Sequence, residues 1–373
     1  MAQPGLTQAG RATDGQGARG SVTLADVARA AGVSRSTVSL VLRGSPLVRA
    51  DTRARVEAEL DRQQYVYNRA AAALRQRTSS SVALVINDLS NPFFAEFAAG
   101  VAEALGEAGY VTLLGSTGES PRRQQAVLVS LLEHAPAGLI LSPAEGSEPA
   151  GLRAALGRMR NVLLFNREVE GMPGDLLALD NEAGARLATR HLVELGYRRI
   201  AFFGDHASSA CRQRRTGYRR AMRAARLPAR VVAAPPVRQE ATAAALRLFE
   251  NLAAADRPDA VVCYNDSVAL GLMAGLAVHG LRAGTDVAIT GFDDIAEAAL
   301  ATPTLTTIAA DPRLRGREAA GLLLQRLQVP DAPPRRVTAA VALRVRASSG
   351  ASFSHAPGAT GAQVSLSLQS LAR

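Results

Sequence analysis

Lysine and tryptophan are both missing from this 373-residue chain, so its basic side chains, apart from five histidines, are all arginines. Basic groups outnumber acidic groups by 43 to 33, which leaves a formal net charge of +10. A surplus of this size favours a polyanionic partner, although an arginine-rich composition alone would also produce it. Arginine forks onto phosphates and guanine edges through paired hydrogen bonds, whereas lysine offers only a point charge. The chain therefore carries a chemistry that suits DNA.

Cysteine and long apolar runs are also scarce, which argues against two classes of protein. Only Cys211 and Cys263 occur, too few for a disulfide framework, and we expect both to be buried free thiols. No apolar run reaches the roughly 18 residues that a membrane span needs. The N-terminal stretch contains no hydrophobic segment of signal-peptide type. We expect a protein of the reducing cytoplasm, with no membrane partner.

Residue patterns for catalysis or metal binding are not found either. The histidines show no metal-ligand spacing, and HLVE at 191–194 is best explained as a helix surface. The segment GSTGES at 115–120 lacks the lysine of a phosphate-binding loop, and no Ser-His-Asp arrangement can be argued. We therefore expect no enzyme, no cofactor and no metal ion.

The length exceeds what one ordinary core accommodates, and composition divides the chain into segments. Residues near both ends are rich in small and polar types and show no periodicity, which is typical of disorder. The expected segments are a disordered arm at 1–21, a helical head at 22–67, a linker at 68–79, a two-lobed body at 80–347 and a flexible tail at 348–373.

The head is predicted to contain three short helices. Thr23 and Asp26 form a capping-box-like start, Gly32 ends the first helix and Ser34 can cap the second. The third helix is predicted from about Thr52 to Gln63. Two helices joined by a tight turn are typical of a helix-turn-helix, whose second helix enters the DNA major groove. A plain three-helix bundle with a solvated basic face is the alternative. The predicted core residues are Leu24, Val27, Ala28, Ala31, Val38, Val41, Leu42, Val56 and Leu60.

The body shows a different sequence pattern, in which strand-like apolar runs alternate with helical runs. These runs include SVALVI, YVTLLG, GLILS, NVLLF, RRIAFFG, DAVVCYN, DVAITGF and TLTTIAA. The alternation indicates βαβ units, and the number of runs predicts two doubly wound parallel-sheet lobes with helices on both faces. A ligand cleft is expected outside the carboxyl ends of the strands.

Several motifs together resemble one family. VTLADVARAAGVSRSTVSLVLRG and VRADTRARVEAELDRQQYVYNRAAAALR are followed in order by INDLSNPFFAEFAAGVAEAL, HLVELGYRRIAFFG, YNDSVALGLM, ITGFDD and LRVRASS. Over about residues 22–349 the chain resembles the lactose-repressor (LacI/GalR) family of bacterial transcription regulators. The resemblance implies a DNA-binding head on a periplasmic-binding-protein-like body. It also implies a homodimeric repressor of palindromic operator DNA, controlled by a small effector, a sugar or related metabolite, bound between the lobes.

The second helix of the head carries the main candidate contacts to DNA. Arg35 and Ser36 lie where they would reach base edges, and Arg35 on guanine would contribute roughly 1–3 kcal/mol of discrimination. Thr37 and Ser39 suit phosphates, whereas Leu40 can touch only a thymine methyl group. The candidate DNA-binding residues are Thr23, Ser34, Arg35, Ser36, Thr37, Ser39, Leu40, Arg43, Asn68, Arg69 and Leu74.

The linker YVYNRAAAALR, at 65–75, matches the family's hinge, which becomes helical only on operator DNA. The resemblance implies that Asn68 begins this helix and that Leu74 is wedged into the minor groove, where an apolar side chain kinks the duplex. Tyr67 stands where the family usually has proline. An ordinary linker helix is the alternative.

The resemblance also assigns an effector site. Arg214 would clamp the ligand, Asp293 would accept hydrogen bonds from its hydroxyls, and Asn265 would supply an amide. Phe94 would stack on a ring, with a place in the core as the alternative. Helix capping is the alternative for each polar residue, and Asp266 is expected to be a cap or a lobe contact. The candidate effector-binding residues are Phe93, Phe94, Asn166, Arg214, Asn265 and Asp293.

Two further expectations concern assembly. The helix predicted at 311–327 is expected to cross between the lobes or to lie near the dimer seam, although its leucines favour a core position. The C-terminal VSLSLQSLAR lacks the heptads of a tetramerising coiled coil, which favours a dimer. A transport-type sugar receptor without a DNA role is the alternative function, and it would leave residues 22–77 unexplained.

Overall fold

The computed structural model describes residues 22–42, 44–65, 79–172, 174–250, 252–253 and 256–350. Contacts divide the chain into two compact units, Met1–Arg77 and Thr78–Arg373. The expected arm at 1–21 and nearly all of the linker lie outside the described residues, as does the tail beyond Gly350.

The head contains three helices, α1 (Leu24–Ala31), α2 (Arg35–Leu42) and α3 (Ala50–Arg62). The predicted capping box is present, because the Thr23 hydroxyl accepts from the backbone of Asp26 while the Asp26 carboxylate accepts from that of Thr23. Gly32 ends α1 in the left-handed conformation, as predicted. The third helix begins at Ala50 rather than Thr52. The buried head core is Val27, Ala28, Ala31, Val38, Val41 and Val56, with Leu24, Leu42 and Leu60 packed against it.

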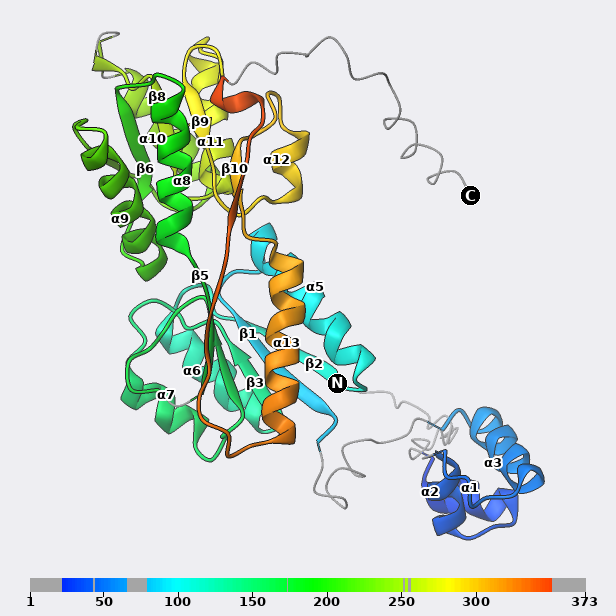
Figure 1. Ribbon diagram of the computed structural model, residues 1–373. Helices are drawn as coiled ribbons and strands as arrows, with labels where there is room; N and C mark the ends of the chain where they lie inside the picture. The colour runs from blue at the N-terminus through cyan, green and yellow to red at the C-terminus, as the bar shows by residue number, and fades with distance from the viewer. Residues whose placement is uncertain are drawn as a thin grey trace, which may run out of the picture. The chain divides into compact units, whose positions relative to one another are not determined.

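The first lobe is built on a six-stranded sheet with the order β11-β5-β4-β3-β1-β2, in which every pairing is parallel (Figure 1). Alternate residues of β1 enter two core clusters, so helices cover both faces. The strands are β1 (Ser81–Ile86), β2 (Val111–Ser116), β3 (Gly138–Leu141), β4 (Val162–Phe165), β5 (Asp175–Leu179) and β11 (Arg336–Ala339). The helices are α5 (Pro92–Glu107), α6 (Pro121–Leu132), α7 (Pro149–Leu156) and α13 (Pro312–Gln328).

The second lobe has a four-stranded parallel sheet with the order β7-β6-β8-β9, and a two-stranded antiparallel sheet formed by β10 and β12. The strands are β6 (Ile200–Asp205), β7 (Arg230–Ala233), β8 (Ala260–Cys263), β9 (Ala288–Thr290), β10 (Thr307–Ala309) and β12 (Ala342–Arg344). The helices are α8 (Asn181–Glu194), α9 (Ser209–Ala224), α10 (Arg238–Glu250), α11 (Asp266–Val278), α12 (Ala296–Leu300) and the 3-10 helix η2 (Ala347–Ser349).

Three segments of the chain join the two lobes (Figure 1). The first lies between β5 and α8, the second between β10 and α13, and the third between β11 and β12. The first segment is hydrogen bonded to the end of β11, where the third segment begins, because the Asp180 amide donates to the Ala339 carbonyl at 3.1 Å. Short connections of this kind allow two lobes to close on a ligand by bending.

The helix predicted at 311–327 is α13, and it packs against α5 within the first lobe (Figure 1). The expectation that it crosses between the lobes is therefore wrong. Its Leu323 is fully buried, as a core position requires. The two helices approach closely, since a Cβ atom added at Gly100 would overlap the Arg313 carbonyl and one at Gly316 would overlap that of Phe97.

The folded body extends further than predicted, because the expected flexible tail begins inside it. Ser348 and Ser349 are fully buried in η2. The Ser348 hydroxyl donates to the Ile289 carbonyl at 2.7 Å, and Ser349 is hydrogen bonded to His191 at 2.9 Å. The boundary expected at 347 is therefore too early, because the folded body includes Ser348 and Ser349.

Both cysteines are buried free thiols, as expected. Burial raises the pKa of each, to about 11 for Cys211, so neither forms a reactive thiolate near neutral pH. Across the described ranges, no helix is long and apolar enough to cross a membrane.

Candidate functional site

The exposed start of α2 forms the candidate DNA surface of the head. Ser34, Arg35 and Ser36 are exposed, and the Ser34 hydroxyl caps α2 by accepting from the Thr37 amide at 3.1 Å. Within the described part of the chain, Arg35 makes no ion pair. The Thr23 hydroxyl is held by the Asp26 carboxylate at 2.6 Å. Ser39 and Leu40 are partly exposed on the same helix.

Four of the candidate DNA contacts, Arg43, Asn68, Arg69 and Leu74, lie outside the described residues. The DNA-binding roles of these four residues stay predictions. The hinge assigned to residues 68–79 also stays a prediction.

In the body, polar side chains gather where the strands of both lobes end, and we call this region the interlobe layer. Asn87, Asn166 and Arg167 follow β1 and β4 of the first lobe, and Asn265 and Asp293 follow β8 and β9 of the second. This is the edge at which open parallel sheets bind ligands. The layer comprises Asn87, Glu119, Glu145, Asn166 and Arg167 of the first lobe with Asn181, Ser209, Arg214, Tyr264, Asn265, Asp266 and Asp293 of the second.

Arg214 of α9 lies at the centre of the second-lobe side and is almost completely buried. Its Nε donates to the Asn181 side-chain oxygen at 2.9 Å and its Nη1 donates to the Tyr264 carbonyl at 2.7 Å. Its guanidinium carbon lies 3.5 Å from the centre of the Phe292 ring. The Asp293 carboxylate is the nearest negative group, at 3.5 Å. Arg214 and Asp293, which the resemblance assigns separately to the effector site, thus lie next to each other.

Asp293 has an unusually high pKa for a carboxyl group. Burial raises its pKa to about 6, against the opposing charge and hydrogen bond of Arg214. Asp266 beside it has a pKa raised well above its ordinary value, by burial and by the charge of Asp293. The backbone at Asp293 has φ of +122°, a conformation that non-glycine residues rarely adopt. Such strain and pKa shifts cluster at functional sites.

Asn265 and Asp266 both have structural tasks at the start of α11. The Asn265 side-chain oxygen caps the helix by accepting from the Val268 amide at 2.9 Å. Asp266 accepts from the Ile295 amide at 3.0 Å and from the Thr307 hydroxyl, so it holds the start of α12 and strand β10 rather than capping α11. The capping alternative is thus present at Asn265.

The aromatic candidates belong to the hydrophobic core of the first lobe. Phe93 and Phe94 are both buried at the start of α5 and pack edge to face, with ring centres 5.2 Å apart. Phe93 also stacks on Phe165. The core alternative therefore accounts for both rings without a ligand.

Asn166 and Arg167 present unpaired polar atoms on the first-lobe side. Asn166 has a left-handed backbone (φ +63°), and its buried side-chain oxygen has no hydrogen-bond partner among the described residues. The same holds for the buried Nε of Arg167. Buried polar atoms without partners are rare in folded proteins, so each calls for a water molecule or a ligand.

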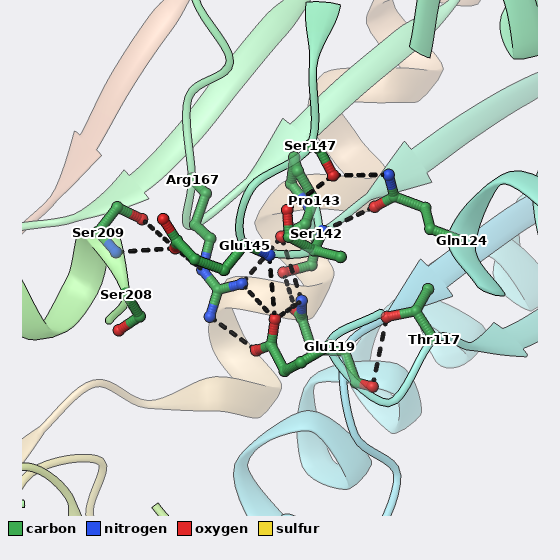
Figure 2. A network of polar contacts seen from close by, with 12 residues as sticks. Thr117, Glu119, Gln124, Ser142, Pro143, Glu145, Ser147, Arg167, Ser208 and Ser209 are labelled. Atoms are coloured by element: carbon green, nitrogen blue, oxygen red, sulfur yellow. Dashed lines mark hydrogen bonds and ion pairs between the residues drawn. The ribbon is translucent and has the colours of Figure 1, made fainter. Parts of the chain in front are cut away.

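Arg167 organises the network drawn in Figure 2, and the sequence analysis did not identify it. Its Nη1 and Nη2 each donate to the Glu119 carboxylate at 2.7 Å, and Nη1 also donates to the Pro143 carbonyl at 2.9 Å. Burial alone would lower the pKa of Arg167, but the hydrogen bond and charge of Glu119 raise it. The Asn87 amide donates to the same two acceptors at 3.1 Å.

One residue of this network, Glu145, contacts the second lobe. Glu145, in the loop after β3, accepts from the Ser209 amide at 2.8 Å and from the Ser209 hydroxyl at 3.2 Å (Figure 2). Its other oxygen accepts from Arg212 at 3.4 Å. Glu145 and Arg167 could have been noticed in the sequence, because both follow strands at the expected ligand edge.

The chemistry of the interlobe layer suits a small polar ligand. It combines guanidinium, amide and carboxylate groups, which donate and accept hydrogen bonds as neighbouring hydroxyls do. In the regions that the structure describes, no three His, Cys, Asp or Glu residues could hold a metal ion together.

Two family models match the chain. Residues 23–68 match the bacterial regulatory proteins of the lacI family, and residues 189–349 match a periplasmic binding protein-like domain.

Curated relatives share nearly a third of their residues with the chain. The HTH-type transcriptional repressor PurR of Vibrio atlanticus (strain LGP32) is 31% identical over 312 residues, which cover 83% of this chain and 93% of the relative. The HTH-type transcriptional regulator GalR of Escherichia coli (strain K12) is 32% identical over 287 residues, covering 77% and 83%.

Solved structures agree with these relatives. The lac repressor dimer bound to operator and the anti-inducer ONPF matches with a TM-score of 0.77 and 26% identity, covering 88% of this chain and 99% of that one. A complex of the transcriptional regulator CelR with cellobiose matches with a TM-score of 0.63 and 30% identity over the same shares. The predicted fold, a helix-turn-helix head on a body of two parallel-sheet lobes, is confirmed.

Proposed function

This chain belongs to the lacI family of bacterial regulatory proteins, and from that premise we propose that it is a DNA-binding transcriptional repressor under effector control. Two chains pair as a homodimer, which places two heads on a palindromic operator. The observation that carries the proposal is the start of α2, where exposed Arg35 lies beside hydroxyl groups after the tight turn at Gly32. A transport-type receptor would have no use for this head.

We propose the following contacts with the operator. Arg35 and Ser36 read base edges, Leu40 touches a thymine methyl group, and Thr37 and Ser39 contact phosphates. Thr23 and Ser34 cap α1 and α2 and lie where a phosphate would also reach them. By resemblance to the family, the remaining contacts come from Arg43 of the head and from Asn68, Arg69 and Leu74 within a hinge at 68–79.

The body, from residue 80 to Gly350, is proposed to bind the effector and to form the dimer. A sugar or related polyhydroxylated metabolite binds in the interlobe layer, in keeping with the cellobiose complex of CelR. Arg214 and Asp293 bind its hydroxyl groups, and the unpaired oxygen of Asn166 supplies a further acceptor. Phe93, Phe94 and Asn265 form part of the wall of this effector site. Effector binding changes how far the two lobes close. This in turn changes how well the paired heads fit the operator.

The relatives are transcriptional regulators and not enzymes, and we propose that this chain likewise has no catalytic step. Its proposed place of action is the cytoplasm, on the DNA of the nucleoid.

The head assignment is tested with DNA. Binding-site selection with the full-length protein yields an operator, and fluorescence anisotropy then compares it with single-base variants. Arg35→Ala should reduce discrimination at one base pair by about 1–3 kcal/mol, because a paired contact with guanine is lost. The exposed Arg55 of α3 offers a matched control, and Arg55→Ala should keep full discrimination. Equal losses on operator and random duplex for Arg35→Ala would contradict the assignment.

A further inference from the structure

Glu145 belongs to the first lobe, yet its short hydrogen bonds are made to the second. Its carboxylate lies 2.8 Å from the Ser209 amide nitrogen, while the Nε of Arg167, the nearest cation of its own lobe, is 3.9 Å away. That distance is too long for a hydrogen bond, although the Arg167 Nε is buried and has no other partner in the described structure. The carboxylate therefore turns away from its own lobe toward α9.

The Glu145 carboxylate contacts the first turn of α9, where a negative charge is stabilised. The first amides of a helix have no partner inside it, and the helix dipole is positive there. Ser208 caps α9 from within the second lobe by accepting from the Cys211 amide, so the Ser209 amide is left for Glu145. Arg212, one turn further along, adds a positive charge at 3.4 Å.

The loop that carries Glu145 is held rigidly. The Glu145 amide donates to Glu119 at 3.2 Å, and Glu119 is fixed by two hydrogen bonds from Arg167. The side-chain oxygen of Gln124, which is buried, accepts from the Ala144 amide at 2.6 Å, next to Glu145 in the chain. In the lobe arrangement seen here, this fixed loop places the Glu145 carboxylate against Ser209 at the start of α9 (Figure 2).

We propose that Glu145 is a latch that caps α9 across the two lobes and holds them together without a ligand. The helix that it caps also carries Arg214, so the latch couples lobe closure to the position of the proposed effector arginine. This coupling rests on the proposed function, whereas the latch itself does not. Opening the lobes exposes the Ser209 amide and leaves the Glu145 carboxylate without its short hydrogen bonds.

Hydrogen exchange measured by mass spectrometry tests the latch in the full-length protein, with neither effector nor DNA present. Peptides that cover the start of α9 should exchange about tenfold faster at Ser209 in Glu145→Ala than in the wild type, because a charge-assisted hydrogen bond is lost. Glu145→Gln keeps an acceptor oxygen but no charge and should exchange about threefold faster. Arg212 is more than half exposed, so Arg212→Ala should change the rate less than twofold.

The matched control is Glu148, an exposed carboxylate three residues along the same loop, which has no side-chain capping bond. Glu148→Ala should exchange like the wild type. Equal exchange at Ser209 in Glu145→Ala and Glu148→Ala would overturn the latch. If Glu145→Ala does not fold, Glu145→Gln decides: faster exchange confined to the start of α9 supports the latch, and unchanged exchange overturns it. Because no effector or DNA is used, failure of the proposed function leaves this result unaffected.

Discussion

Two arginines line the interlobe layer, and their surroundings differ. Arg167 donates two hydrogen bonds of 2.7 Å to one carboxylate, that of Glu119. Arg214 donates its shortest bonds to neutral oxygens, and its only carboxylate, Asp293, lies 3.5 Å away and has a raised pKa. The protein therefore satisfies the charge of Arg167 itself, whereas it leaves that of Arg214 only loosely paired. A loosely paired, buried guanidinium is suited to binding a ligand, and a tightly paired one to supporting loops.

The largest expected effect follows from the loops that Arg167 supports. Arg167→Met should lower the free energy of unfolding by about 3 kcal/mol, because its three hydrogen bonds to the Glu119 carboxylate and the Pro143 carbonyl are lost and only neutral amide donors remain there. Urea denaturation followed by circular dichroism measures this change. The exposed Arg186 of α8 is the control, and Arg186→Met should stay within about 0.5 kcal/mol of the wild type. If Arg167→Met lowers the free energy of unfolding by less than about 1 kcal/mol, the structural role that distinguishes Arg167 from Arg214 would be contradicted.

The loose pairing of Arg214 predicts a pH dependence of stability. Folded Asp293 keeps its proton up to a pH of about 6, whereas the unfolded residue loses it near 3.8, so unfolding releases a proton between these values. The contribution of Asp293 to the free energy of unfolding therefore falls as pH rises from about 4 to 6, by about 2–3 kcal/mol in total.

The comparison of wild type with Asp293→Asn removes this contribution, together with the effect of the Asp293 charge on the pKa of Asp266. The stability difference between the two should change across that window in favour of the variant, as measured by urea denaturation at several pH values. Asp175 should behave in the opposite way. Burial would raise its pKa, but hydrogen bonds from Arg326 and Arg335 lower it below 3.8, so its stabilisation is lost only as pH falls through that lowered value. A pH-independent difference for Asp293→Asn would contradict its raised pKa.

A smaller change in free energy is expected for the ligand. Arg214→Met should weaken effector binding ten- to a hundredfold, or about 1.4–2.7 kcal/mol, because hydrogen bonds to ligand hydroxyls are lost. Isothermal titration calorimetry with a panel of mono- and disaccharides measures the affinity, and Arg186→Met again serves as the control. An unchanged affinity for Arg214→Met would mean that the effector does not bind at Arg214.

Much of the fold was predictable from the sequence, because local signals determine it. The capping box at Thr23, the turn at Gly32 and the alternating runs of the body all depend on neighbours in the chain. β5, β7, β11 and β12 were missed. β11 lies at the edge of its sheet and is mostly exposed, so it lacks the apolar run of a central strand. β7, also an edge strand, is only four residues long.

The candidate site was predictable only in part. Resemblance to the family, and not periodicity, brought Arg214 and Asp293 together across 79 positions. It did not reveal the Glu119–Arg167 pair or the contact of Glu145 with Ser209. These interactions join residues 48 and 64 positions apart in the chain, and no local pattern encodes such a distance. In the sequence, Glu119, Glu145 and Arg167 also look like ordinary charged surface residues, because the burial of Arg167 follows only from the fold.

The most direct test of the account is the affinity of the purified full-length protein for its selected palindrome and for a scrambled duplex of equal length, at moderate salt. We expect the palindrome to bind at least about a thousandfold more tightly, since specific operators exceed bulk DNA by this margin or more. Equal affinities for the two duplexes, with and without the sugar panel, would contradict the assignment of this chain as an operator-binding regulator.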